Sequence, residues 1–187
     1  MIEYIQYDDD SCLEIMEKIP MIIEIDRIIK ISKEGNNFGG INYSFSEEDV
    51  PKYSHDFDIA EPVLGWRKYG TGSWGFFMAY DDGKPIGAAT VAAKSPELKM
   101  LDGRDDIALL WDMRLPAEYR RQGIGQRLFD MAVEWSTGGG YKMMKIECQN
   151  TNLPAARFYE KQGAELVVIN PHAYNTEKTM FLWYNCK

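Results

Sequence analysis

Residues 107–126 read IALLWDMRLPAEYRRQGIGQ, and the rest of the fold is arranged around this stretch. An apolar run ends before Pro116, a short polar link follows, and two arginines lead to Gly123 and Gly125, where a helical pattern begins. A strand, a glycine-containing turn and a helix start, in this order, can bind phosphate, because unpaired N–H groups and the helix dipole both attract an anion. Glycines let the backbone approach that anion without an intervening Cβ. We therefore expect residues 120–126 to bind a diphosphate.

Two other phosphate-binding loops do not match this stretch. A Walker loop, GxxxxGK followed by Ser or Thr, does not occur, and the dinucleotide pattern GxGxxG fails because Leu128 stands where the third glycine is needed. The pattern [QR]-x-x-G-x-[GA] does match, at Arg120, Gly123 and Gly125. It resembles the acetyl-CoA pyrophosphate loop of the GNAT superfamily of acyltransferases. Taken alone, the motif also allows an ordinary helix N-terminus with glycines that turn the chain.

A second segment, residues 142–163, reads KMMKIECQNTNLPAARFYEKQG. It is similar to the strand, asparagine corner and FYEKxGF helix that follow the pyrophosphate loop in GNAT enzymes. Ala164 departs from that pattern, since the family has a large apolar or aromatic residue there, and this affects packing rather than chemistry. The resemblance covers residues 73–187 and implies acetyl-CoA as co-substrate. The matching residues of this segment are Asn152, Ala155, Ala156, Phe158, Tyr159, Glu160 and Gly163.

The length of 187 residues predicts one domain, residues 1–187, with a substantial core. The resemblance implies that residues 1–72 form mainly the acceptor-substrate side and residues 73–187 the acetyl-CoA-binding core. The sequence has no run of eighteen apolar residues, and its N-terminus lacks the basic and apolar parts of a signal peptide. We therefore expect a cytoplasmic location and no association with a membrane.

The three cysteines, Cys12, Cys148 and Cys186, are widely spaced and form no CxxC pair. Free, reduced thiols are the expected state, and no metal site is expected. Cys148 could be a nucleophile, but a small apolar filler on a buried strand is the preferred interpretation.

The formal net charge of −8 disfavours nucleic acid as a partner and favours a cationic ligand. Acidic clusters are frequent in the first half of the chain, where the resemblance places much of the acceptor wall. The sequence does not fix the oligomeric state, and a homodimer is compatible with it.

Alternation and helical spacing predict an α+β fold: a single mixed, mostly antiparallel sheet flanked by helices, as in GNAT acyltransferases. Residues 22–32 fit a strand or a helix, and we favour the strand; residues 46–73 are expected to be irregular or partly helical. Asp81-Asp82-Gly83-Lys84 predicts a hairpin turn. The expected strands are 2–7, 22–32, 41–45, 74–80, 85–93, 107–115, 143–148, 166–169 and 179–184, and the expected helices are 11–19, 122–136 and 154–162.

The resemblance assigns the binding of acetyl-CoA to backbone N–H groups of the loop and to the strand before it. In the family that strand carries a bulge and separates from the next strand, so that free backbone groups bond the pantetheine arm and the thioester carbonyl. The expected cofactor-binding residues are Met113, Arg114, Leu115, Arg120, Arg121, Gln122, Gly123, Ile124, Gly125, Gln126, Asn152, Ala155, Phe158 and Tyr159.

Tyr159 is the candidate general acid, because in the family this tyrosine faces the sulfur of the cofactor. Alternatively, Phe158 and Tyr159 are both core aromatics; since helix neighbours differ by about 100°, Phe158 can pack while Tyr159 faces the cleft. Asn152 either bonds polar atoms of the cofactor or caps the helix.

Two carboxylates are candidates for the general base, because an alkylamine with a pKa near about 10.4 must lose a proton before it attacks. Glu147 stands where some GNAT enzymes keep a base that works through water. Asp112 competes from the preceding strand, on the face expected to carry Ala108, Leu110 and Arg114. A simple Asp112–Arg114 ion pair is an equally good interpretation.

Within the superfamily the chain resembles the streptothricin acetyltransferases. The resemblance rests on the length, an acidic first half with Trp66 and Trp74, the string WDMRLPAEYRRQGIG, and the ending from Asn170 through Tyr174. It implies acetylation of a β-lysine amino group of streptothricin and antibiotic resistance. The alternatives are a GNAT enzyme acting on a protein N-terminus or lysine, a polyamine or an aminoglycoside, and a non-catalytic acyl-CoA sensor or interaction module.

Overall fold

The computed structural model describes residues 1–171 and 179–186. Tyr174, part of the resemblance above, lies outside these residues. The chain divides into two compact units, each built from separate segments. Unit 1 comprises Met1–Ile22, Asp56–Ile146 and Trp183–Lys187, and unit 2 comprises Ile23–His55 and Glu147–Leu182. The predicted single domain, with its functional division after residue 72, stays a prediction.

The main sheet has seven strands, mixed and mostly antiparallel, as predicted. Its order begins β1-β4-β5-β6-β7, where the first three pairings are antiparallel and β6 pairs with β7 in parallel. The order continues with β9 and β8; β7 and β9 each have residues in both units, and β8 belongs to unit 2. The strands are β1 (Ile2–Tyr7), β4 (Gly75–Asp81), β5 (Lys84–Ala92), β6 (Ile107–Arg114), β7 (Met143–Gln149), β8 (Glu165–Asn170) and β9 (Thr179–Asn185).

The predicted hairpin between β4 and β5 is confirmed. Its two central residues, Asp82 and Gly83, have φ of 45° and 81°. Positive φ at both positions characterises the two-residue turn whose twist matches that of paired strands, and aspartate followed by glycine adopts it at low cost.

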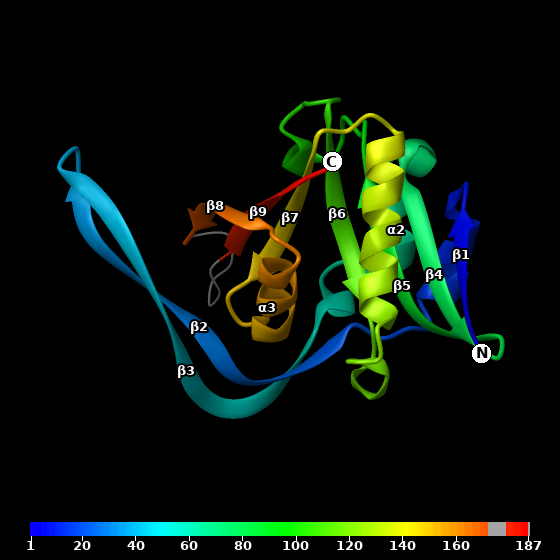
Figure 1. Ribbon diagram of the computed structural model, residues 1–187, viewed down its shortest axis with the longest axis horizontal. Helices are drawn as coiled ribbons and strands as arrows, with labels where there is room; N and C mark the ends of the chain where they lie inside the picture. The colour runs from blue at the N-terminus through cyan, green and yellow to red at the C-terminus, as the bar shows by residue number, and fades with distance from the viewer. Residues whose placement is uncertain (172–178, 187) are drawn as a thin grey trace. The chain divides into compact units, whose positions relative to one another are not determined.

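Helix α2 (Ile124–Gly138) belongs to unit 1 and packs along β4, β5 and β6 (Figure 1). Its buried residues recur at helical spacing, which is why the segment forms a helix with one apolar face. They are Ile124, Leu128, Phe129, Met131, Ala132 and Ser136. The predicted helix over 11–19 is shorter in the structure: a 3₁₀ turn η1 (Asp10–Cys12) and α1 (Leu13–Met16). Helix α3 (Leu153–Lys161) belongs to unit 2.

Strands β2 (Ile22–Asn37) and β3 (Gly40–Asp56) form a separate two-stranded sheet. The strand preferred for residues 22–32 is confirmed, but the irregular structure expected over 46–56 is wrong. The strand predicted over 41–45 is the start of β3, but β3 leaves nearly all its side chains exposed on both faces, and residues 46–56 lack the apolar alternation that identifies a strand. Three 3₁₀ turns follow it: η2 (Phe57–Ile59), η3 (Val63–Tyr69) and η4 (Thr71–Ser73).

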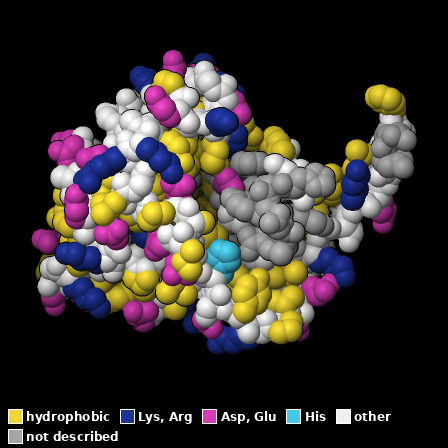
Figure 2. Space-filling model, turned by 180° about the vertical axis from the view of Figure 1, so that it is seen from behind, with side chains coloured by type: hydrophobic (Ala, Val, Ile, Leu, Met, Phe, Trp, Pro, Cys, Tyr) yellow, Lys and Arg dark blue, Asp and Glu magenta, His cyan; other side chains and the backbone are white. Residues whose placement is uncertain are grey.

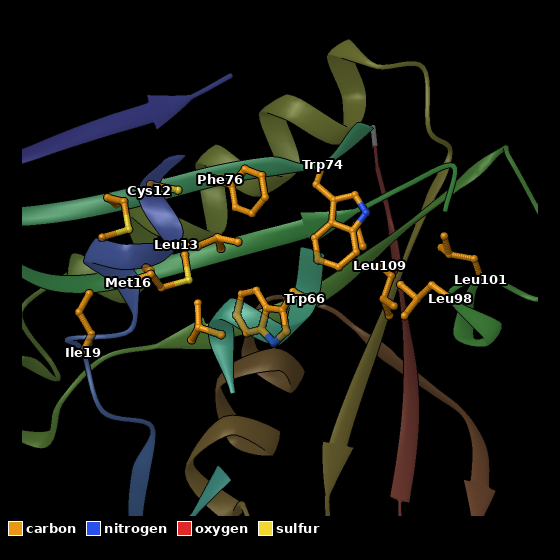
Figure 3. Packing of buried hydrophobic residues seen from close by; sticks show 14 of the residues in the cluster. Cys12, Leu13, Met16, Ile19, Trp66, Trp74, Phe76, Leu98, Leu101 and Leu109 are labelled. Atoms are coloured by element: carbon orange, nitrogen blue, oxygen red, sulfur yellow. The ribbon is translucent and has the colours of Figure 1, made fainter. Parts of the chain in front are cut away.

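One hydrophobic cluster of unit 1 lies on the sheet face that carries α1 and η3, and the buried residues of α2 pack elsewhere in the same unit. In Figure 3, Trp66 and Trp74 stand between Leu13 and Met16 on one side and leucines such as Leu109 on the other. Burial of these large side chains contributes the main stabilisation of the unit, on the order of 2 kcal/mol for each fully buried aliphatic residue. The strands next to the candidate site are therefore held by a continuous packed layer.

Candidate functional site

The loop between β6 and α2 is closed by its own side chains. After η6 (Ala117–Tyr119), Arg120 Nε donates a hydrogen bond of 3.0 Å to the main-chain oxygen of Leu115. Gln122 Nε2 donates one of 2.8 Å to the main-chain oxygen of Glu118. Arg120 therefore fixes the conformation of the loop through its guanidinium, in addition to its predicted contact with the diphosphate. Arg121 is exposed.

The same loop has the backbone conformation of an anion-binding turn. Arg121 and Gly123 adopt left-handed φ of 61° and 83°. Such residues turn successive N–H groups toward one concave side, which attracts anions. Gly123 caps α2 without a side-chain hydrogen bond, and the first helical bond is donated by Arg127 N to Gly123 O at 3.0 Å. The N–H groups of Ile124 and Gly125 precede that bond, so no helical carbonyl is available to them.

The glycines of the loop differ in the space around them. A Cβ built at Gly123 has no atom within 4 Å. One built at Gly125 would lie 3.5 Å from Met113 Cε and 3.7 Å from Leu115 Cδ2, which are ordinary contact distances. A Cβ at either position would therefore meet no protein atom closer than an ordinary contact distance, and the binding of a phosphate group there stays a prediction.

β6 contains a bulge at Trp111. Thr90 of β5 lies opposite Asp112, but the next residue, Val91, lies opposite Leu110, so Trp111 is an extra residue in β6. The parallel pairing of β6 with β7 runs from Ile107–Met143 to Leu110–Ile146 and ends there, one residue before the bulge. The bulge that the resemblance implies is thus present, two residues before the expected segment Met113–Leu115.

The bulge corrects the predicted face of Asp112. Asp112 and Arg114 lie opposite Thr90 and Ala88, on the face where Thr90 Oγ1 donates to Met16 Sδ at 3.7 Å. Ile107 and Leu109 join the same core cluster. The extra residue shifts the alternation by one, so Asp112 does not share the face of Ala108 and Leu110, as had been expected from unbroken alternation.

Arg114 is buried, with 2% of its surface exposed, and no guanidinium nitrogen lacks an acceptor. Nε and Nη2 each donate to one oxygen of Asp112 at 2.8 Å. Nη1 donates to Ile19 O at 2.8 Å and to Asp58 Oδ2 at 3.3 Å, while Nη2 lies 3.0 Å from Asp58 Oδ1. The ion-pair interpretation of Asp112 and Arg114 is therefore confirmed, and Asp58 is a third member that the sequence did not reveal.

The two carboxylates keep Arg114 charged. Burial alone would lower the pKa of its guanidinium, but the charges and hydrogen bonds of Asp112 and Asp58 raise that pKa above its ordinary value. A proton placed on Asp112 would weaken two charge-assisted bonds at once. This geometry disfavours Asp112 as a proton acceptor.

Aromatic side chains line the same face around the bulge residue. The Trp111 ring centroid lies 6.1 Å from that of Trp66, 5.4 Å from that of Tyr69 and 5.7 Å from that of Trp74. The Arg114 guanidinium lies 5.7 Å from the centroid of Trp66, within range of a cation–π interaction. Among the described residues, the buried indole nitrogens of Trp66 and Trp74 have no hydrogen-bond partner. Trp66 and Trp74 are buried, whereas Tyr69 and Trp111 are half-buried, so the rings of Tyr69 and Trp111 are the ones that can contact a cationic ligand.

A cavity of about 330 Å³ lies beside the loop in unit 1. It is lined by three segments distant in sequence, which the motifs therefore could not identify: Lys18, Ile19, Pro20 and Ile22; Lys84, Pro85 and Ile86; and Pro116, Ala117, Glu118 and Tyr119. Lys84 Nζ lies 5.8 Å from the centroid of the Tyr119 ring.

The remaining predicted site residues belong to unit 2. Asn152 caps α3, accepting a 3.3 Å bond from Ala155 N, so its predicted capping role is confirmed. Tyr159 is 7% exposed and packs edge-on against Phe158, with ring centroids 5.5 Å apart. Glu147 is half-buried on β7. The pairing of Tyr159 with the cofactor stays a prediction.

The cysteines are free thiols, as expected. Burial raises the pKa of Cys148 to about 12, with a smaller contribution from the charge of Glu147. The thiol therefore stays protonated at neutral pH, which disfavours the nucleophilic interpretation. Within residues 1–171 and 179–186, no group of three or more His, Cys, Asp or Glu side chains is placed to hold a metal ion. No helix in this part of the chain is both long and apolar enough to cross a membrane.

Comparison with known proteins identifies a family and several similar structures. Residues 42–164 match the family described as Acetyltransferase (GNAT) family. Streptothricin acetyltransferase A of Bacillus subtilis (strain 168) is 25% identical over 91 residues, which are 46% of this chain and 53% of that protein. The chain thus spans about half the length of this curated relative.

Two solved structures share the fold over nearly the whole chain. A nourseothricin acetyltransferase has a TM-score of 0.76 at 20% identity, covering 100% of this chain and 99% of that one. A protein of Bacillus anthracis str. Ames, provisionally named a streptothricin acetyltransferase and solved with acetyl coenzyme A, has the same TM-score and identity and covers 99% of both chains. The ribosomal-protein-S18-alanine N-acetyltransferase of Escherichia coli is more distant, with a TM-score of 0.55 at 19% identity over 67% of this chain and 77% of that one.

Proposed function

Because the chain belongs to the acetyltransferase (GNAT) family, we propose that it transfers the acetyl group of acetyl-CoA to a primary amine of a cationic small molecule. The proposed acceptor is the β-lysine amino group of streptothricin. The loop with left-handed Arg121 and Gly123, in front of the uncapped start of α2, carries this proposal, because it offers main-chain donors to a diphosphate.

Main-chain groups of the loop and of β6 would bind the coenzyme. N–H groups around Arg121 to Gln126 would hold the diphosphate, with Arg121 as an exposed cation at the rim. The main chain of residues 113–115 would bond the pantetheine arm and the thioester carbonyl. Fixing the coenzyme beside the amine supplies rate through proximity, and an N–H group on the carbonyl oxygen stabilises the charge that develops there.

Two side chains of unit 2 are proposed to move protons. Glu147, through water, would take a proton from the ammonium group, and the free amine would then attack the carbonyl carbon. As the carbon–sulfur bond breaks, the Tyr159 hydroxyl would give its proton to the departing thiolate, and the second proton lost by the attacking nitrogen would return through water to Tyr159. Glu147 is preferred to Asp112 because both oxygens of Asp112 already accept bonds from Arg114.

Charge and aromatic surface support a cationic acceptor. The net charge of −8 attracts polyamines. The rings of Tyr69 and Trp111 on the core face of β6 can interact with ammonium groups. Proteins with the same fold over nearly the whole chain carry the names nourseothricin and streptothricin acetyltransferase. The narrower acceptor rests on these likenesses and on the resemblances in the sequence.

Mass spectrometry of streptothricin after incubation with acetyl-CoA and the protein tests this proposal. We expect a mass increase of one acetyl group, located on the β-lysine chain by fragmentation. A parallel panel should contain a polyamine, an aminoglycoside and a peptide with a free N-terminus. Acetylation of a panel member but not of streptothricin would reject the narrow acceptor. Binding of acetyl-CoA without release of CoA to any amine would instead indicate a non-catalytic sensor.

The biological consequence can be measured separately. Expression in a streptothricin-sensitive bacterium should raise the minimal inhibitory concentration of streptothricin, and a Tyr159→Phe variant at equal abundance should raise it less. Equal protection by the wild type and the variant would show that the resistance does not depend on the Tyr159 hydroxyl.

A further inference from the structure

We propose that Arg114 is a positioning residue for acetyl transfer, and that Asp112 and Asp58 hold its guanidinium rather than exchange protons with the substrate. This inference rests on the proposed function, because it concerns the main chain assigned to the thioester. Three features of unit 1 support the inference. The Arg114 side chain joins three chain segments, a bulge lies close to it in β6, and its charge is balanced by Asp112 and Asp58.

Arg114 joins segments that are far apart in the sequence. Its guanidinium bonds Asp112 on β6, the main chain of Ile19 before β2, and Asp58 after β3. The last two segments also bond each other directly. Met21 N donates to Asp58 Oδ2 at 3.0 Å, and Phe57 N donates to Met21 O at 3.1 Å. A single side chain therefore fixes the segments on either side of the β2–β3 hairpin to β6.

The attachment holds β6 next to residues 113–115, whose main chain must be placed accurately if it binds the thioester as proposed. Pairing with β7 ends at Leu110, and the register with β5 shifts at Trp111. Beyond the bulge, β5 is the strand whose pairing with β6 continues, through Ala89–Met113 and Ala88–Arg114. Because a bulge disrupts the ladder locally, a buried anchor immediately after it reduces the freedom of the main chain at residues 113–115.

The charges of the cluster are consistent with an anchor. One guanidinium faces two carboxylates, and Trp66 covers it at 5.7 Å. The Asp112 side chain is 7% exposed, whereas that of Asp58 is 28% exposed. A lysine at position 114 would keep the positive charge but could not bond both oxygens of Asp112 in the planar, two-pronged geometry of arginine. Arg114→Lys therefore tests geometry separately from charge.

Arg114→Lys should lower kcat by about tenfold or more while the KM for acetyl-CoA changes by less than about threefold, since a shift of about 1 Å in a positioned group costs up to a hundredfold in rate. Arg104→Lys is the matched control. Arg104 makes the same two bonds to Asp106, each 2.8 Å, but on an exposed surface. Amide hydrogen exchange at residues 113–115 should accelerate in Arg114→Lys and not in Arg104→Lys. Equal kcat values for the two variants would overturn the inference.

The variant Asp112→Asn distinguishes a positioning role of Asp112 from a role as general base. It also replaces Arg114→Lys as the test if that variant does not fold. The ionisable or charged groups in contact with Asp112 and Arg114 in the described structure are each other and Asp58. If Asp112 only holds Arg114, kcat falls but the acidic limb of the pH–rate profile keeps its midpoint, while Glu147→Gln removes that limb. Loss of the acidic limb in Asp112→Asn would identify a base and refute the positioning role.

Failure of this inference can be told apart from failure of the proposed function. If the wild-type protein acetylates no amine, the proposed function fails, whereas calorimetric binding of acetyl-CoA and amide exchange still report on the anchor. In that case, exchange at residues 113–115 that is equal in wild type, Arg114→Lys and Asp58→Asn would overturn the anchor as well. Faster exchange in both variants would support it.

Discussion

Gly125 can accept a methyl group without strain from the protein. A Cβ at this position meets Met113 and Leu115 only at ordinary contact distances, and alanine is favoured over glycine in a helix. Gly125→Ala should therefore leave the free energy of unfolding within about 1 kcal/mol of wild type. It should weaken acetyl-CoA binding by about tenfold or more, because the methyl group would occupy space needed by the diphosphate and remove a close contact worth more than about 1 kcal/mol. Isothermal titration calorimetry and thermal denaturation measure the two effects.

Gly138→Ala is the matched control for this variant. Gly138 ends the same helix, and a Cβ there has no atom within 4 Å. The affinity of the Gly138→Ala variant for acetyl-CoA should equal that of the wild type. Gly123 is a poorer probe, because its φ of 83° strains any residue with a Cβ. Undiminished affinity in Gly125→Ala would place the diphosphate elsewhere.

Tyr159→Phe removes one hydroxyl and keeps the ring that packs against Phe158. It should lower kcat by about a hundredfold with acetyl-CoA affinity unchanged, the size of effect expected for loss of a general acid. Tyr141→Phe is the control, because Tyr141 is equally buried, at 7% exposure, but belongs to unit 1 outside the proposed site. Release of CoA thiol gives kcat for all three proteins. Similar rates for both variants would assign Tyr159 to packing alone.

At the scale of elements, Asn152 serves α3 as its N-cap. Asn152→Ala should cost about 1 kcal/mol of unfolding free energy, because Ala155 N loses its acceptor, whereas Asn152→Ser should restore most of it. The serine variant also tests the predicted contact with the cofactor. If Asn152 bonds acetyl-CoA as well, Asn152→Ser remains stable but binds the coenzyme more weakly. Wild-type affinity in a stable Asn152→Ser protein would limit Asn152 to capping. Chemical denaturation and calorimetry provide both measurements.

Elements with a local signal could be predicted, and elements without one could not. Asp82-Gly83 specifies its turn, and the apolar face of α2 specifies a helix, since both depend on neighbours in sequence. β3 exposes both faces, so nothing in residues 46–56 alternates. The bulge at Trp111 is likewise a property of pairing with β5. For that reason the face of Asp112 was predicted wrongly although the strand itself was predicted correctly.

The same limit applies to the site as a whole. The loop glycines, Asn152 and Tyr159 belong to contiguous motifs and could be proposed from the sequence. Asp58 and the carbonyl of Ile19 meet Arg114 across 56 and 95 positions of the chain, and no local pattern predicts such contacts. The groups proposed for chemistry therefore lie in local motifs, whereas the groups proposed to hold them come together only in the folded chain.

At the scale of the molecule, the net charge of −8 should affect the two proposed substrates in opposite ways. We expect a polycationic acceptor to be attracted and the anionic coenzyme to be repelled, although acidic and basic side chains are interspersed on the face shown in Figure 2. Raising the ionic strength from about 0.01 M to about 0.15 M shortens the screening length from about 30 Å to about 8 Å. The kcat/KM for streptothricin should fall severalfold, and that for acetyl-CoA should be unchanged or rise.

An acceptor with a single amino group is the control for this measurement, because its smaller charge predicts a weaker dependence on salt. Initial rates at constant pH and matched viscosity give both values of kcat/KM. A parallel fall for the two substrates would indicate a general effect of salt on the enzyme rather than attraction of the acceptor.

The bulge also limits how the gene can change in length. Deleting the codon for Trp111 would place Asp112 directly after Leu110, so Asp112 and Arg114 would still lie opposite Thr90 and Ala88, but the strand would lose its bulge. Deleting the codon for Met113 would instead place Asp112 and Arg114 on opposite faces of the sheet and break the buried ion pair. Replacing Trp111 by another residue would leave the frame of the strand intact. Natural variation in length should therefore be tolerated at the bulge more readily than between Asp112 and Arg114, and other insertions and deletions should be confined to surface turns.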